Sequence, residues 1–195
     1  MKPITSRMAL GLVSALALAI PAAAQTETWQ LDPPHCAAKF AVRHMGISTV
    51  RGTFTKVSGT VQYNAADPSK SSIDPASVDS RVEMRDNDLR SEKLLDVQKY
   101  PAITFKSRRV EPTGSGKLKV TGVLMIRGMT KELVLDVDGP SPPMTDPRGN
   151  SHMGASATAT INCRDFGVSG YPPAMIADDV AITIDVELVK PAATK

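Results

Sequence analysis

From about residue 29 to residue 190, the chain is a succession of short runs in which apolar and polar residues alternate. The last run is the clearest, because Val180 and Ile182 share one parity while Thr183 takes the other. A period of two predicts strands that bury one face. Many such runs in a single chain predict a sandwich or a closed barrel.

The remaining runs place about eight strands along the chain, which is the number in small closed barrels. Besides the last run, strands are expected near 36–44, 53–63, 77–84, 103–107, 118–126, 133–137 and 153–164. The polar stretch 64–75 is expected to be a loop. The fold class is therefore all-β, with an apolar face on every strand that a barrel would turn inward.

One segment, residues 86–98, breaks the strand pattern and predicts a short helix. Asp86 can cap its start, and Leu89, Leu94 and Leu95 recur at roughly helical spacing. Tyr100 precedes a proline, and a residue in that position avoids the helical region. We expect this helix to cover one end of the barrel.

Residues 1–24 have the layout of a secretory signal peptide. Lys2 and Arg7 precede an apolar stretch over 8–20, and small residues end at Ala24. The apolar stretch is shorter than the ~20 residues that a membrane-spanning helix needs. We expect cleavage after Ala24 and a single domain over residues 25–195.

Charge and cysteine content narrow the function class. The formal net charge is +3, two of these charges lie in the predicted signal, and no long basic block follows, so nucleic-acid binding has little support. No second apolar segment is long enough to cross a membrane. Cys36 and Cys163 lie on the apolar parity of their strands, which favours two buried thiols over a disulfide.

Neither a metal site nor a catalytic group stands out. The histidines, His35, His44 and His152, are widely spaced, and no zinc motif appears. His152 could be combined with Asp146 and Ser156 as a triad, but no nucleophile elbow surrounds a serine. The methionines show no M-x-x-M clustering that would favour copper. We expect no metal, no cofactor and no enzymatic activity.

Several separated segments resemble one family, the YceI family, in their order and spacing over nearly the whole chain after the signal. They are Trp29, Asp32, His35, Phe40, Val42, His44, Gly46, Gly52 and Phe54, then 85–91, 95–96, 100–101, Phe105 and Ser107, then 121–122, 128–131 and 165–167. The resemblance implies an extended, lipocalin-like antiparallel barrel in the bacterial periplasm. It also implies that the lumen holds a polyisoprenoid or another long amphiphilic lipid.

The residues expected to bind this lipid are mostly those of the apolar parity. They are Phe40, Val42, His44, Phe54, Val82, Arg90, Ile103, Phe105, Leu124, Ile126, Ile161 and Ile182. The alternative is a core filled by side chains, since a small barrel can be filled or hollow. Aromatic residues are only 4% of the chain and the strand around Ala157 has little bulk, which favours a cavity, and the resemblance favours it further.

Two polar residues in this set have competing interpretations. His44 ends an apolar strand face, where a histidine is more often a hydrogen-bonded structural residue than a ligand contact. Its place in the matched motif puts it near the mouth of the lumen. Arg90 either pairs with Asp86 beside the helix or meets a polar or phosphate headgroup. We favour the structural role for Arg90.

The sequence therefore predicts a periplasmic protein that binds or carries a polyisoprenoid, such as a quinone or a prenyl phosphate. Two alternatives stay open. One is an enzyme acting on such a substrate, with His44 and a nearby carboxylate as the acid–base pair. The other is an interaction module without a cavity, whose partner docks on the loops around 140–147. A homodimer is compatible with all three.

Overall fold

The computed structural model describes residues 27–63 and 70–192, and the predicted signal peptide lies outside these ranges. The strands are β1 (Glu27–Leu31), β2 (Ala37–His44), β3 (Ser48–Phe54), β4 (Val57–Tyr63), β5 (Lys70–Ile73), β6 (Val78–Asp79), β7 (Ile103–Gly114), β8 (Lys117–Ile126), β9 (Met129–Asp138), β10 (Met144–Thr145), β11 (Ser151–Asn162) and β12 (Ile176–Lys190). One α-helix, α1 (Glu83–Arg90), and three 3-10 turns, η1 (Pro33–His35), η2 (Pro75–Ser77) and η3 (Cys163–Phe166), complete the described chain.

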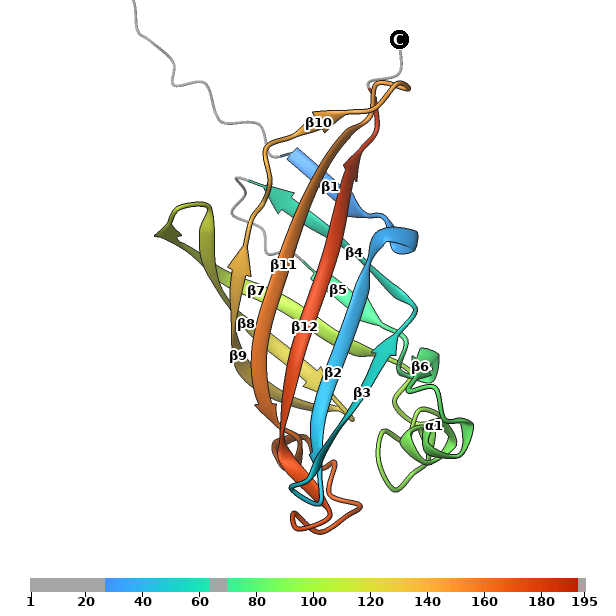
Figure 1. Cartoon of the computed structure of the whole chain (residues 1–195). Coiled ribbons are helices and arrows are strands. Elements are labelled where there is room, and N and C mark those ends of the chain that lie inside the picture. Colours follow the sequence, from blue (N-terminus) through green and yellow to red (C-terminus); the bar gives the residue numbers. More distant parts are fainter. Residues whose placement is uncertain (1–26, 64–69, 193–195) are drawn as a thin grey trace, which may run out of the picture.

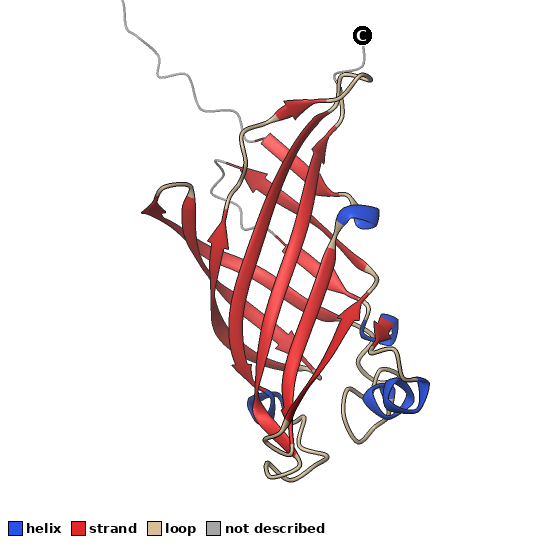
Figure 2. Cartoon of the chain, in the orientation of Figure 1, coloured by secondary structure: helices blue, strands red, loops and turns tan. Residues whose placement is uncertain are grey.

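Eight of these strands form a closed antiparallel ring in the order β11, β9, β8, β7, β5, β4, β1 and β12 (Figures 1 and 2). The ring closes because β11 pairs with β12 along its whole length, from Ser151 opposite Lys190 to Asn162 opposite Asp179. The pairing is short at some seams, since β9 meets β11 only at residues 136–138 and β1 meets β12 only at Gln30 and Leu31. The predicted all-β antiparallel barrel of about eight strands with one short helix is confirmed.

The long strand β12 makes the barrel extended. Near its end it pairs with β1, with Leu188 opposite Leu31, and over its first two thirds it pairs with β2, with Ile184 opposite Ala38. The β2–β3 hairpin therefore prolongs the wall beyond β1 (Figure 1). One end of the barrel carries α1, η3 and the β2–β3 turn, and we call it the α1 end. The other carries β10 and is called the β10 end.

The buried apolar residues form two clusters in different parts of the barrel. One is centred on Trp29, whose side chain is almost fully buried, and includes Leu31, Cys36, Ala38, Val57, Met153 and Leu188. The other consists of Ile103, Leu124, Ile126 and Phe166. Apart from Cys36 and Phe166, these buried side chains come from strands and face inward, as the pleat requires.

The pairing differs from the sequence expectation at two places. The run expected as one strand over 53–63 divides into β3 and β4, because residues 55 and 56 form backbone hydrogen bonds with Ser77 and Asp74. Within the expected loop 64–75, residues 70–73 form β5 between β4 and β7. Its serines carry no alternating pattern, so the two neighbouring strands decide its conformation.

The helix also starts and ends earlier than expected. It spans Glu83–Arg90, and residues 91–99 continue as turns. Asp86 is not the cap, because its carboxylate is buried and accepts a hydrogen bond from the Ser80 backbone N–H at 2.9 Å. Val82 occupies the N-cap position, so the strand expected over 77–84 is reduced to β6. Across the described residues, no helix is long and apolar enough to cross a membrane.

Candidate functional site: the barrel lumen

The barrel encloses a cavity of about 1370 Å³. A packing defect in a protein core is rarely larger than one water molecule, whereas this volume equals about 45 waters at roughly 30 Å³ each. It also exceeds the ~300–1,000 Å³ of ordinary small-molecule pockets. The interpretation as a solid core is therefore wrong for this barrel, and the lumen has room for a long ligand.

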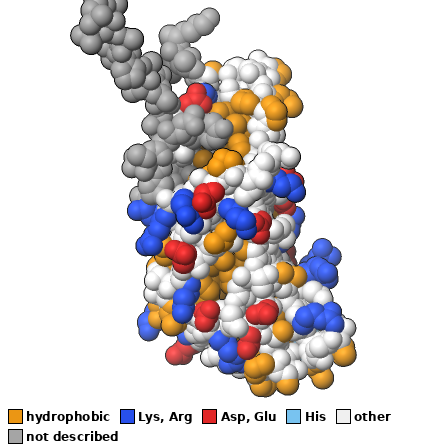
Figure 3. Space-filling view, turned by 90° about the vertical axis from the view of Figure 1, so that its left-hand side faces the viewer, with side chains coloured by type: hydrophobic (Ala, Val, Ile, Leu, Met, Phe, Trp, Pro, Cys, Tyr) orange, Lys and Arg blue, Asp and Glu red, His pale blue; other side chains and the backbone are white. Residues whose placement is uncertain are grey.

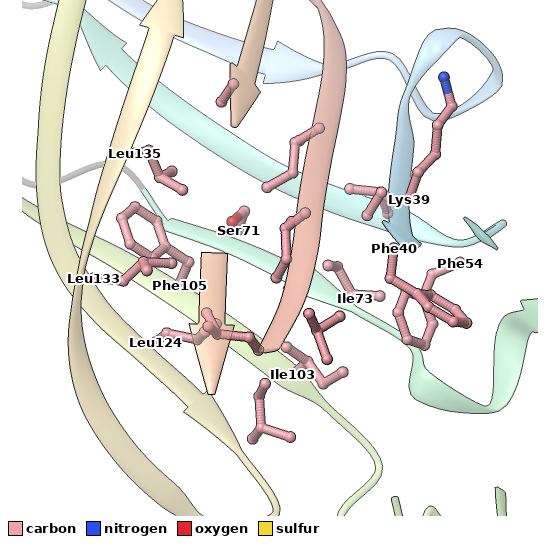
Figure 4. Close-up of a pocket in the computed structure, with 18 of the residues that line it drawn as sticks. Lys39, Phe40, Phe54, Ser71, Ile73, Ile103, Phe105, Leu124, Leu133 and Leu135 are labelled. Carbon is pink, nitrogen blue, oxygen red and sulfur yellow. The ribbon is translucent and has the colours of Figure 1, made fainter. Parts of the chain in front are cut away.

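The lining follows the strand parity that the sequence indicates. Eleven of the twelve predicted residues line the cavity: Phe40, Val42, His44, Phe54, Val82, Ile103, Phe105, Leu124, Ile126, Ile161 and Ile182. In the close-up, Phe40, Ile73 and Ile103 project from different strands into the same space, and Phe105 lies across it beside Leu133 (Figure 4). Whether these side chains contact a lipid stays a prediction.

Two phenylalanine rings are folded against the wall instead of filling the lumen. Phe40 lies opposite Gly52, and a methyl group on Gly52 would come 2.4 Å from its ring. Phe105 covers Gly122 of the neighbouring strand in the same way, also at 2.4 Å. Each glycine provides the space that its partner ring occupies. Both rings therefore lie over the neighbouring strand, a feature that strand alternation alone does not reveal.

The α1 end of the lumen has a polar margin. The predicted apolar stripe of Leu89, Leu94 and Leu95 lines the cavity here, which places α1 and the turns after it beside the mouth (Figure 1). The Tyr171 hydroxyl donates a 2.7 Å hydrogen bond to Asp88, and both residues line the cavity. The sequence analysis missed this pair, because the partners are 83 positions apart and neither belongs to an alternating strand.

Arg90 is the predicted site residue that does not line the cavity. Its guanidinium donates hydrogen bonds to the backbone oxygens of Ala76 at 2.9 Å and Val78 at 2.7 Å. The suggested ion pair with Asp86 is wrong, because Asp86 is engaged by Ser80. These bonds attach α1 to η2 and β6, which agrees with a structural role, and whether Arg90 also meets a headgroup stays a prediction.

His44 lines the cavity at the α1 end, where its strand meets the start of β12. Among the described residues, no carboxylate oxygen lies within 4.0 Å of its ring nitrogens. The acid–base pair that the enzyme hypothesis required is therefore not formed at His44. The suggested triad is also not assembled. His152 does contact Asp146, at 3.2 Å, but its other ring nitrogen is bonded with Glu187, and the Ser156 hydroxyl donates to Asp185 instead.

The other two histidines, although far apart in sequence, lie near the same carboxylate, Glu187, on the outside of the barrel. Glu187 contacts His152 at 2.8 Å and lies 3.9 Å from His35, which is itself 2.7 Å from Asp32. The ligand atoms of Asp32, His35 and Glu187 lie within 4.8 Å of one another. The fold brings His35 and His152 to the same carboxylate although they are widely spaced in the sequence, because Glu187 on β12 lies between η1 and β11.

These contacts change the protonation behaviour of both rings. The hydrogen bond with Glu187 raises the pKa of His152, and a second bond, to Asp146, raises it further. The hydrogen bond with Asp32 raises the pKa of His35. Burial favours a higher pKa for Asp146, but hydrogen bonds from Asn150, His152 and the Arg148 backbone outweigh it and lower the pKa to about 2. The cluster is therefore a chain of contacts between histidines and carboxylates on the outer wall, and these contacts favour the protonated rings.

Both cysteines are free thiols, as expected. Cys36 is buried in the cluster around Trp29, and Cys163 lines the cavity. Burial raises the pKa of each thiol. A raised pKa keeps the reactive thiolate scarce at neutral pH, so neither cysteine has the environment of a nucleophile.

Comparison with known proteins agrees with this geometry. The family model described as a YceI-like domain matches residues 29–188. The chain belongs to the YceI-like family. A UPF0312 protein of Vibrio cholerae is 35% identical to it over 167 residues, covering 83% of this chain and 87% of the relative.

Solved structures support the fold of this YceI-like protein. The YceI protein of Campylobacter jejuni matches with a TM-score of 0.68 at 29% identity, covering 76% of this chain and 89% of that one. A polyisoprenoid binding domain from Saccharophagus degradans, implicated in plant cell wall breakdown, matches with a TM-score of 0.62 at 16% identity, covering 84% and 98%. The second likeness concerns the fold alone.

Proposed function

We propose that this protein is a periplasmic binding or carrier protein that holds a polyisoprenoid, such as a quinone or a prenyl phosphate, or a similar amphiphilic lipid. The observation that carries the proposal is the large cavity enclosed by the apolar parity of the strands. Membership of the YceI-like family and the fold shared with a polyisoprenoid binding domain support the class of ligand. The secretory layout of residues 1–24 supports the compartment.

The mechanism is desolvation of the lipid tail. Transfer of apolar surface from water stabilises the complex by ~2.5 kcal/mol for each 100 Å² buried, so an extended tail binds tightly without directional contacts. The polar groups near the α1 end, including Asp88 and Tyr171, lie where a headgroup would remain after the tail has entered. Binding alone accounts for this arrangement, and no chemical step is required of the protein.

The test is native mass spectrometry of the protein produced with its own leader, followed by organic extraction and identification of the lipid. We expect one long-chain lipid per chain. Ala157→Phe adds a ring on the lumen side, and Thr158→Phe adds the same ring to the neighbouring residue, which is exposed and outside the lining. The first variant should lose the lipid and the second should keep it.

A protein of apo mass that stays unchanged after incubation with prenyl lipids would refute the proposal. Equal lipid content in the Ala157→Phe and Thr158→Phe variants would place the binding site outside the lumen. The mature N-terminus, read from the same intact mass, tests the predicted cleavage after Ala24.

A further inference from the structure

Several large apolar side chains at the α1 end face solvent. Ile47 is 77% exposed and Met84 is 83% exposed, and Met45 and Met175 are also exposed. They come from the β2–β3 turn, the first turn of α1 and the loop before β12, and the Met45 backbone N–H donates to the Met175 oxygen at 2.8 Å. In the space-filling view, hydrophobic side chains are exposed at the lower end of the molecule as well as along its side and at its top (Figure 3). We call these four residues the apolar rim.

The apolar rim is continuous with the lumen. Met84 and Met175 line the cavity themselves, and the turn that carries Met45 and Ile47 joins His44 to Ser48, both of which line it. An exposed apolar surface of this kind marks an interaction site. Here it surrounds one mouth of the cavity, so whatever contacts the rim also faces the lumen.

The positive charge beside the rim lies on the β2–β3 hairpin and around the start of α1, whereas Met175 is followed by Asp178, which is paired with Arg164, and by Asp179. Segments 43–51 and 81–85 carry four arginines and a single carboxylate, Glu83. Among the described residues, no carboxylate lies within 4.0 Å of the guanidinium groups of Arg43, Arg51 or Arg81, whereas Lys39 on the same hairpin is paired with Asp185 at 2.7 Å. Unpaired cations next to exposed apolar side chains are suited to an anionic bilayer surface.

We propose that the apolar rim docks this protein on a lipid bilayer and so presents the mouth of the lumen to the membrane. The inference rests on the proposed function, because a lipid that enters the lumen must come from a membrane. A protein bound to the rim would cover the mouth of the lumen and block the entry of lipid. A bilayer bound there would instead supply the lipid directly. The rim side chains insert among the headgroups while the arginines contact lipid phosphates.

The experiment is flotation of the purified protein with vesicles of phosphatidylethanolamine and phosphatidylglycerol. In the variant Met45→Asn/Ile47→Ser, neither changed residue lines the cavity, and asparagine tolerates the positive φ of 52° at position 45. The matched control is Met144→Ser at the β10 end, where Met144 is 73% exposed. Loss of two inserted side chains should weaken vesicle binding at least about tenfold, and the control should bind normally.

A second variant tests the charges separately. Arg51→Gln/Arg81→Gln should bind vesicles containing phosphatidylglycerol about tenfold more weakly, with no change on vesicles of phosphatidylcholine alone. Arg43 is left unchanged, because its guanidinium donates hydrogen bonds to Thr49 and to the Gly46 oxygen within the turn that carries Met45 and Ile47. This variant leaves the apolar rim in place, so it decides the matter if the first variant does not fold. Vesicle binding equal to that of the unmodified protein in both variants, or an equal loss in Met144→Ser, would overturn the proposal.

Loading from detergent micelles separates the two proposals. All variants should take up prenyl lipid from micelles as the unmodified protein does, because the lumen lining is unchanged. Vesicle binding through the rim without uptake from micelles by any protein would refute the lipid-carrier function and leave the docking surface intact. Uptake from micelles without flotation on vesicles would refute membrane docking and leave the lipid-carrier function intact. It would point to a protein partner at the rim.

Discussion

Two lumen glycines lie beneath phenylalanine rings, and replacing each with alanine tests whether this packing keeps the cavity open. A methyl group at Gly52 would meet the Phe40 ring at 2.4 Å, and its nearest backbone atom would be the Asp79 oxygen at 3.1 Å. At Gly122 the methyl group would meet the Phe105 ring at 2.4 Å and also the Lys106 backbone oxygen at 2.6 Å. The two sites thus differ in whether the obstacle can move.

The expected cost follows from that difference. Optimal contacts between carbon atoms are at about 3.5–4.0 Å, so each ring must move by more than ~1 Å. At Gly52 the ring can turn into the empty lumen, and overpacking of about 1–3 kcal/mol is partly offset by the ~0.5–1 kcal/mol that alanine gains over glycine in a strand. At Gly122 the strands β7 and β8 must also separate, so we expect a loss of about 3 kcal/mol or more.

Gly154 provides the matched control, because its φ is not positive and a methyl group there would have only the Val186 oxygen nearby, at 3.8 Å. Gly154→Ala should be neutral or stabilise the protein by up to about 1 kcal/mol. Urea unfolding measures all three variants, and at a slope of about 1–3 kcal/mol per molar urea, Gly122→Ala should lower the midpoint by ~1 M or more.

A double variant shows whether the ring is the cause. Combining Gly52→Ala with Phe40→Leu removes the ring that the methyl group meets, so the two changes should together cost less than the sum of their separate effects. Gly52→Ala alone should also reduce lipid uptake, because the displaced ring occupies the lumen. If the Gly122→Ala protein were as stable as the Gly154→Ala protein, the reasoning would be refuted. If the effects of Gly52→Ala and Phe40→Leu on stability were strictly additive, the Phe40 ring would not be the cause of the destabilisation.

Two further predictions concern groups outside the lumen. The pKa of His152 is raised above 6.5 chiefly by its bond with Glu187, so the pair stabilises the fold fully below the unfolded pKa and loses this effect as pH rises through the folded pKa. The urea midpoint should fall as the pH rises above about 6.5, and Glu187→Gln should flatten the profile. Arg90→Ala removes two hydrogen bonds to carbonyl oxygens and should cost about 1–3 kcal/mol without loss of bound lipid. Lipid loss at unchanged stability would instead assign Arg90 to the headgroup.

Much of the candidate site could be predicted because it consists of strand residues. The parity of Phe40 and Val42, or of Ile182, decides which side of its strand each residue occupies, and a closed ring can bury only one side. The exception, Arg90, lies on the helix, where no alternation applies and the partners are carbonyl oxygens of residues 76 and 78. Side chains that bond to backbone oxygens leave no pattern in the sequence.

The sequence by itself determined the all-β class, the inward face of each long strand and the apolar character of the lining, because a pleated strand alternates its side chains whatever lies beside it. The tertiary structure alone decided that the barrel is hollow, since this depends on which strands pair and on the rings lying over Gly52 and Gly122. It likewise decided that His35 and His152 share Glu187, because contacts across 35 or more positions depend on strand order and register. Local sequence patterns indicate the secondary structure and the buried face of a residue, whereas the pairing of distant strands determines which side chains it contacts.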